Sequence, residues 1–228
     1  MNANIDKCWA EKYCKGYPEK CNKFCDGYVI LEILYSQSNI PKRYQYPQHL
    51  IVEDIDLDVF SRIEHILNNI HKWVDNGNNL LIYGENKGNG KTSLACAIAN
   101  YYIRYRAKNL VTYEPVVYFI KSAKFLEDLR RQYDNPDPAF PKIMELIETV
   151  PLLIIDDIGA EKPSDWVRER LLNIIDERYS NNLSIIYTSN CSLNELAVNL
   201  HGRIADRIKE SEVLHMKSTS KRGANNND

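Results

Sequence analysis

Three glycines, two lysines and a threonine lie close together in residues 84–93, which read Gly-Glu-Asn-Lys-Gly-Asn-Gly-Lys-Thr-Ser. Gly88 and Gly90 allow the backbone amides to curl around an anion, because no Cβ stands in the way. The Lys91 side chain can reach the β- and γ-phosphates of a nucleotide, and the Thr92 hydroxyl can ligate Mg²⁺. In the strict form of this pattern a glycine lies five residues before Gly90, at the position of Glu85, but here the glycine is one step earlier. The sequence predicts a phosphate-binding loop that is one residue longer than usual.

A second set of polar residues follows later apolar segments. Leu152 to Ile155 ends in the carboxylates of Asp156 and Asp157. Asp156 is placed to hold the shell of a Mg²⁺ ion, and Asp157 to orient or deprotonate an attacking water. Taken alone, such a pair could also cap a loop. The next apolar segment ends in Thr188-Ser189-Asn190, so Asn190 either lies beside the γ-phosphate or caps the helix that starts near Ser192.

These side chains can meet only if the elements before them form a parallel sheet. Short apolar segments predict strands at 80–83, 116–120, 151–155, 183–188 and 213–216. Apolar residues at helical spacing predict helices at 57–75, 92–105, 123–133, 141–150, 164–179, 193–200 and 203–209. This alternation indicates an α/β fold whose parallel sheet is covered by helices on both faces. The strands of the two motifs need not be sequence neighbours, as expected when another strand is inserted between them.

Four of the six cysteines lie in the first 25 residues, at Cys8, Cys14, Cys21 and Cys25. Four thiolates suit a structural, tetrahedral Zn²⁺ site. An iron–sulfur cluster takes the same ligands, and free cysteines without metal are a third interpretation. The sequence predicts a cysteine-rich module at residues 1–35, a connector at 36–50, an α/β domain at 51–219 and a flexible tail at 220–228.

Composition and charge limit the class of protein. The chain has 228 residues with 29 Lys and Arg against 31 Asp and Glu, a net charge of −2. A charged fraction of 26% and a hydrophobic fraction of 44% are typical of a globular protein and exclude a disordered chain. Near-neutral charge provides no global attraction to nucleic acid. The sequence has no apolar segment long enough to span a bilayer, and its N-terminus lacks the apolar core of a signal peptide. We therefore expect a cytoplasmic protein with reduced thiols and no membrane association.

The motifs together resemble the AAA+ ATPases, and more narrowly the DnaC/DnaI-type replicative helicase loaders, over roughly residues 40–222. The residues that carry the resemblance are Gly88-Asn89-Gly90-Lys91-Thr92-Ser93, Asp156-Asp157-Ile158-Gly159-Ala160-Glu161, Trp166-Val167-Arg168, Thr188-Ser189-Asn190 and Gly202-Arg203-Ile204-Ala205-Asp206-Arg207-Ile208. The resemblance implies an AAA+ core with a five-stranded parallel sheet. It also implies that ATP binds to the residues from Gly88 to Ser93 and that Mg²⁺ binds near Thr92 and Asp156.

The same resemblance implies further site residues. Asn190 would be the first sensor of the nucleotide. Arg207, or as a second choice Arg203, would be the arginine finger that reaches the ATP of a neighbouring subunit in a head-to-tail ring or spiral. Basic residues within 217–222 would also sense the nucleotide. Asp157 stands where the wider AAA+ class has a longer glutamate, which favours slow hydrolysis.

By this resemblance the chain would load a hexameric replicative helicase onto single-stranded DNA. ATP would hold the complex together, hydrolysis would release it, and the N-terminal module would grip the helicase. Basic residues that could contact DNA are Lys121, Lys124, Arg130 and Arg131. Two alternatives are an IstB-like AAA+ transposition regulator and a scaffold that binds nucleotide without turnover.

Overall fold

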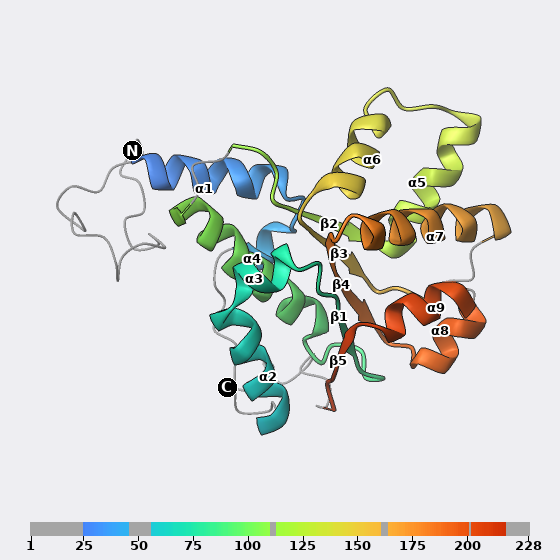
Figure 1. Cartoon of the computed structure of the whole chain (residues 1–228). Helices are drawn as coiled ribbons and strands as arrows, with labels where there is room; N and C mark the ends of the chain where they lie inside the picture. Colours follow the sequence, from blue (N-terminus) through green and yellow to red (C-terminus); the bar gives the residue numbers. More distant parts are fainter. Residues whose placement is uncertain (1–24, 46–55, 110–112, 161–163, 201, 218–228) are drawn as a thin grey trace, which may run out of the picture.

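The computed structural model describes residues 25–45, 56–109, 113–160, 164–200 and 202–217. One parallel sheet has the strand order β2-β3-β4-β1-β5 (Figure 1). Its strands are β1 (Leu80–Tyr83), β2 (Val117–Lys121), β3 (Leu152–Asp156), β4 (Ser184–Ser189) and β5 (Glu212–His215). The inserted strand is β4, which pairs with β1 on one side and with β3 on the other. The predicted five-stranded parallel sheet is therefore confirmed.

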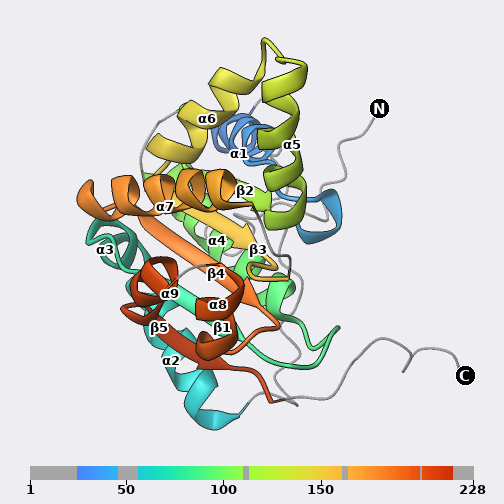
Figure 2. The same ribbon diagram turned by 90° about the vertical axis from the view of Figure 1, so that its right-hand side faces the viewer.

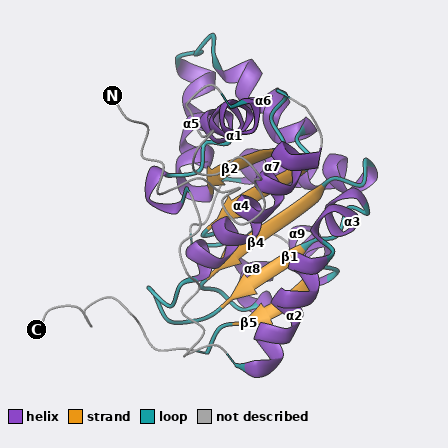
Figure 3. Cartoon of the chain, turned by 90° about the vertical axis from the view of Figure 1, so that its left-hand side faces the viewer, coloured by secondary structure: helices purple, strands orange, loops and turns teal. Residues whose placement is uncertain are grey.

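One face of the sheet is covered by helices from the first half of the chain, shown at the left of Figure 1 and facing the viewer in Figure 3. They are α1 (Asp26–Gln37), α2 (Leu57–Asn68), α3 (Ile70–Asp75) and α4 (Lys91–Asn109), and a short 3-10 turn lies at Lys42–Tyr44. Alternate strand residues such as Leu80, Ile82 and Ile154 pack into this cluster and are fully buried. α4 lies against the central strands and begins directly after the phosphate-binding loop.

Helices from the second half of the chain cover the other face, which Figure 2 shows from the front. They are α5 (Ser122–Asp134), α6 (Phe140–Thr149), α7 (Asp165–Ser180), α8 (Leu193–Asn199) and α9 (Gly202–Lys209). Leu81, Leu153 and Ile155, which alternate with the residues of the first face, belong to this second cluster. Because both faces are covered, the strands read in the sequence as nearly continuous apolar segments.

The predicted single helix at 57–75 is wrong, because the chain forms α2 and α3 with a break at Asn69. The backbone of Asn69 leaves the helical region at φ −119°, and its Nδ2 donates to the carbonyl of His65 at 3.1 Å. Short polar side chains of this kind compete with the helix for backbone partners. The other predicted strands and helices agree with the structure to within a few residues at each end.

Helix α1 was not predicted, and it lies mostly inside the segment expected to be a cysteine-rich module. Ile30, Leu31 and Leu34 of α1 are at most 3% exposed and pack into the same cluster as α4 and the sheet. Residues 26–37 therefore pack with the α/β core. Cys8, Cys14 and Cys21 lie outside the described residues, as do the tail at 220–228 and residues 46–50 of the predicted connector at 36–50.

Candidate nucleotide-binding site

The loop between β1 and α4 holds a buried lysine. Lys91 is 7% exposed, and its Nζ donates to Gly84 O at 2.7 Å, to Asn86 O at 3.0 Å and to Asn89 Oδ1 at 2.9 Å. All three of these acceptors are neutral oxygens. A positive charge that is partly removed from water attracts an anion more strongly than an exposed one. The loop therefore presents a preorganised cation at the first turn of α4, next to the free amides of that turn.

The loop is anchored to the chain segment that follows β5. Asn89 is 1% exposed, and its Nδ2 donates to the carbonyl of Met216 at 3.0 Å. A Cβ at Gly84 would lie 2.5 Å from that same carbonyl oxygen, so only glycine permits the close approach. Gly88 and Gly90 have φ of 82° and 94°, which side chains disfavour. The longer loop thus keeps its shape through two positive-φ glycines and a contact with residue 216.

A carboxylate at the end of β3 connects the loop to β4. Asp156 is 7% exposed, and its Oδ1 accepts hydrogen bonds from Thr92 Oγ1 and Thr188 Oγ1, both at 2.7 Å. Ser93 follows Thr92 in the first turn of α4 and is half-buried. Within the part of the chain that the structure describes, Oδ2 of Asp156 makes no hydrogen bond. A hydroxyl oxygen and a carboxylate oxygen at one edge of the sheet are ligands that suit Mg²⁺ or its bound water.

The next residue adopts an unusual backbone conformation. Asp157 has a φ of 60°, which is uncommon outside glycine and often marks a functional residue. Its amide donates to Thr188 Oγ1 at 2.9 Å, and its Oδ1 accepts from Asn190 Nδ2 at 2.6 Å. Residues at the end of β4 therefore hold Asp157 at both its backbone amide and its carboxylate.

The rim of the site carries an ionisable pair at the end of β1. The Tyr83 hydroxyl donates to Glu85 Oε1 at 2.8 Å, and the Tyr83 ring stacks on His215 with centroids 4.7 Å apart. The hydrogen bond to Glu85, with a smaller effect of burial, raises the pKa of Tyr83 to about 12. Glu85, which replaces the usual first glycine, thus contacts the strand that precedes the loop.

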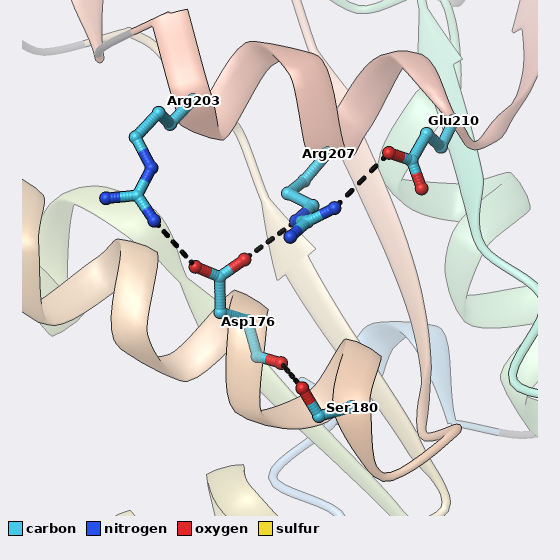
Figure 4. A network of polar contacts seen from close by, with 5 residues as sticks. All are labelled: Asp176, Ser180, Arg203, Arg207 and Glu210. Atoms are coloured by element: carbon cyan, nitrogen blue, oxygen red, sulfur yellow. Dashed lines mark hydrogen bonds and ion pairs between the residues drawn. The ribbon is translucent and has the colours of Figure 1, made fainter.

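The two candidate arginines lie on α9 and contact α7 (Figure 4). Arg207 Nε donates to Asp176 Oδ1 at 2.7 Å, and Arg203 Nη2 lies 3.5 Å from Asp176 Oδ2. The hydrogen bond to Asp176 raises the pKa of Arg207. Among the described residues, the partners of Arg207 are Asp176, Tyr179 and Glu210, none of which belongs to the loop or the acidic pair. The structure does not bring Arg207 to the site of its own chain.

The other predicted site residues are only partly described. Cys25 is an exposed free thiol just before α1, while the other three predicted zinc ligands lie outside the described residues. Where the structure gives side chains, no group of three or more potential metal ligands occurs. Lys217 is exposed, and residues 218–222 lie outside the described part of the chain. The zinc or iron–sulfur site stays a prediction.

Sequence reasoning missed three contributors to these arrangements. Thr188 bridges Asp156 and Asp157, and its position at a strand end in Thr-Ser-Asn was an available signal. No sequence signal marked the Met216 carbonyl or the Asp176 carboxylate, because both act through contacts between segments far apart in the sequence.

The fold and the site together define a class of protein. A glycine loop ends in a buried lysine at the start of α4, an acidic pair follows β3, and a polar-ended strand lies between β1 and β3. This arrangement is that of a P-loop NTPase of the AAA+ type.

Comparison with known proteins assigns the chain to a family. Residues 36–227 match the family of IstB-like ATP binding proteins, to which the chain therefore belongs. It is 27% identical to the replicative helicase loader DnaI of Bacillus subtilis over 231 aligned positions, which cover 88% of this chain and 70% of that protein. It is 26% identical to the replicative helicase loader DnaC of Escherichia coli, of which it spans about half (51%), over 58% of its own length.

Solved structures give the same picture. A crystal structure of the DnaC helicase loader superimposes with a TM-score of 0.59 at 27% identity, covering 78% of this chain and 100% of that one. A crystal structure of DnaI gives a TM-score of 0.60 at 25% identity, covering 79% and 96%. In the described part of the chain, every helix is too short or too polar to cross a membrane.

Proposed function

We propose that this protein is an ATP-dependent loader that places a hexameric replicative helicase on single-stranded DNA. The observation that carries the proposal is the similarity to helicase loader DnaI, at 27% identity over 88% of the chain. Lys91, Asp156 and Asp157 at one sheet edge support the ATP-dependent part. ATP would hold loader and helicase together, and its hydrolysis would release them.

The residues present fit a triphosphate with Mg²⁺. The loop amides and the buried Lys91 ammonium would hold the phosphates, and Thr92 Oγ1 with Asp156 would hold Mg²⁺, directly or through water. A bound Mg²⁺ would neutralise charge on the phosphates. Thr92 and Thr188 donate to the same Asp156 oxygen, so the second oxygen keeps its lone pairs for this purpose.

Asp157 would act on the water that hydrolyses ATP. Its carboxylate would accept the water proton as the oxygen bonds to the γ-phosphorus and the bond to the departing ADP breaks. Asn190 holds Asp157 at 2.6 Å and could exchange that contact for the γ-phosphate, as expected of a sensor. A carboxylate shorter than glutamate would position the water less well, so we expect slow hydrolysis stimulated by assembly.

The loading role is tested by the complex itself. Full-length protein is incubated with the host replicative helicase, with or without ATP and Mg²⁺, and the complex is measured by size-exclusion chromatography with light scattering. The expected result for wild type is a complex whose stability depends on ATP. With Lys91→Ala, ATP should no longer change the amount of complex. Absence of any ATP-sensitive complex with the helicase would contradict the loading role.

The DNA part of the proposal rests on basic side chains near the end of β2. Lys121, Lys124, Arg130 and Arg131 are exposed. Lys124 and Arg131 form ion pairs with Asp128 and Glu127 of their own helix, at 3.2 and 3.1 Å. Lys121 and Arg130 are therefore the stronger candidates for phosphate contacts. Their replacement by alanine should weaken binding to single-stranded oligonucleotides of any sequence and reduce its salt dependence.

The family match supports one alternative. The chain belongs to the IstB-like family, and it is 29% identical to a protein of insertion sequence IS1162 over half of its length. A transposition regulator would form its ATP-sensitive complex with a transposase and leave the helicase unbound. A nucleotide-binding scaffold without turnover would release no phosphate from ATP, whereas the proposed loader releases phosphate in a reaction that Lys91→Ala abolishes.

A further inference from the structure

Asp176, in the C-terminal third of α7, contacts both arginines of α9 (Figure 4). One oxygen of its carboxylate binds Arg207 and the other binds Arg203. Its side chain is 29% exposed, so the pair lies at the protein surface but is partly shielded from water. The two guanidinium groups share this carboxylate, and Arg207 also pairs with Glu210 at 3.4 Å.

Asp176 forms hydrogen bonds of different geometry with the two arginines. It binds Arg207 through Nε, the edge nearest the helix, at 2.7 Å. Beneath the guanidinium, the Tyr179 ring lies 4.5 Å from Cζ. Nη1 of Arg207 makes a longer contact of 3.4 Å with Glu210. The guanidinium of Arg207 is thus held in one orientation by contacts with three residues of its own chain.

Arg203 makes a longer contact with Asp176. Its contact with Asp176 uses an outer nitrogen at 3.5 Å, the limit of a hydrogen bond. Its side chain is 68% exposed, against 35% for Arg207. An exposed ion pair of this kind contributes little to the ordering of a side chain. The two arginines therefore differ in their contact with Asp176 and in their exposure.

The part of α7 that carries Asp176 is itself anchored. Two residues further on, Arg178 is completely buried and donates to the carbonyls of Ile147, Val150 and Ser184. Ser180 Oγ donates to the Asp176 backbone carbonyl at 2.8 Å. Asp176 is therefore presented from a helix turn attached to both α6 and β4.

We infer that Asp176 is a positioning residue that orients Arg207, rather than Arg203, to act on the nucleotide of a neighbouring copy of this chain. The inference rests on the proposed ATPase function. Among the described residues, Arg207 contacts neither the loop nor the acidic pair of its own chain, so it can act on a nucleotide only across an interface between two copies. Asp176 itself contacts no nucleotide, and it works by fixing the rotamer of Arg207 before assembly.

The test mixes two inactive full-length variants. Lys91→Ala lacks the nucleotide site but supplies the arginine, and Arg207→Ala lacks the arginine but supplies the site. Their mixture should hydrolyse ATP, measured as phosphate release with Mg²⁺ at concentrations where wild-type turnover per protomer is maximal. Adding Asp176→Ala to the Lys91→Ala partner should lower kcat about tenfold without changing KM. Adding it to the Arg207→Ala partner should change neither, because that protomer has no arginine left to position.

A matched control separates positioning from loss of any ion pair. Asp128 on α5 also has a 29% exposed side chain in an ion pair, with Lys124. Asp128→Ala in the Lys91→Ala partner should leave the turnover of the mixture unchanged. Circular dichroism and urea midpoints of every variant should match those of the parent within experimental error.

Four results would overturn the inference. They are equal loss of turnover whichever partner carries Asp176→Ala, a rise in turnover, no hydrolysis by the mixture, and retained hydrolysis by Arg207→Ala alone when Arg203→Ala has lost it. Absence of hydrolysis by the wild-type protein is different, because it would overturn the proposed ATPase function and this inference with it.

Discussion

Two buried cations, Lys91 and Arg178, lie on opposite faces of the sheet and illustrate two uses of the same chemistry. Both donate to neutral oxygens. Lys91 binds three oxygens of its own loop, whereas Arg178 binds backbone carbonyls at the end of α6 and at the start of β4. Lys91 is 7% exposed and Arg178 is completely buried.

The surroundings, rather than the burial, distinguish a functional cation from a structural one. Lys91 lies among glycines at positive φ and beside polar strand ends. Arg178 is enclosed by apolar residues of α6, α7 and β4. Burial lowers the pKa of Arg178 to about 9, so the guanidinium keeps its charge at neutral pH. The negative C-terminal end of the α6 dipole favours that charge. Arg178 thereby connects α7 to α6 and to β4.

The largest expected effect follows from removing the structural cation. Arg178→Met would leave the carbonyls of Ile147, Val150 and Ser184 buried without this donor. We expect the free energy of unfolding to fall by about 3 kcal/mol, measured by urea denaturation with the slope unchanged.

The control for this change is Arg131→Met, the same substitution on an exposed face of α5. The Arg131 side chain is 56% exposed and pairs with Glu127 at 3.1 Å. Its replacement should change stability by less than about 0.5 kcal/mol. Equal losses of unfolding free energy at the two positions would show that the burial of Arg178 does not increase its contribution to stability.

The functional cation should give the reverse pattern. Lys91→Met removes the ammonium from a loop that water can enter, so stability without nucleotide should stay within about 1 kcal/mol of wild type. Wild type at a nucleotide concentration 100 times Kd should gain about 2.7 kcal/mol, and Lys91→Met should gain none. Thermal unfolding with and without a non-hydrolysable ATP analogue and Mg²⁺ measures both quantities. A variant that unfolds more easily yet still responds to nucleotide would place Lys91 in the structural class.

A third residue lies between these two classes. Thr188 is 1% exposed and joins Asp156 to the amide of Asp157. Thr188→Val keeps the shape and removes both hydrogen bonds, so we expect a loss of about 1–2 kcal/mol in urea denaturation together with slower phosphate release. Thr188→Ser keeps the hydroxyl and should restore phosphate release. If the valine and serine variants hydrolysed ATP equally, the hydroxyl would have no role in holding the acidic pair.

The sequence was sufficient for those parts of the fold that depend on local pattern. Every strand, and most helices, appeared as apolar segments or helical spacing, because both faces of the sheet are covered. The helix at 57–75 failed because Asn69 breaks it through a side-chain bond to His65. Helix α1 was not predicted, because the four cysteines before it indicate a metal-binding module, whereas Ile30 and Leu34 pack into the core.

The site was predictable only where a local sequence pattern marks its residues. Lys91 and Thr92 belong to a contiguous motif, and Asp156, Asp157 and Asn190 follow apolar strands. The choice between Arg203 and Arg207 depends on Asp176, which reaches them from another helix. No spacing in the sequence encodes that contact, because the packing of α7 against α9 creates it.

The smallest expected effect concerns the rim of the nucleotide site. In the folded protein the hydrogen bond to Glu85 raises the pKa of Tyr83 to about 12, against an ordinary value near 10. Between these values the folded state binds more protons than the unfolded state, so this contribution to stability is complete below pH 10 and is lost as the pH rises towards 12. Glu85→Gln keeps an acceptor and removes the charge, so its urea midpoint should fall less than that of wild type between pH 9 and pH 11. Identical falls in both proteins would mean that the Tyr83–Glu85 contact does not persist in solution.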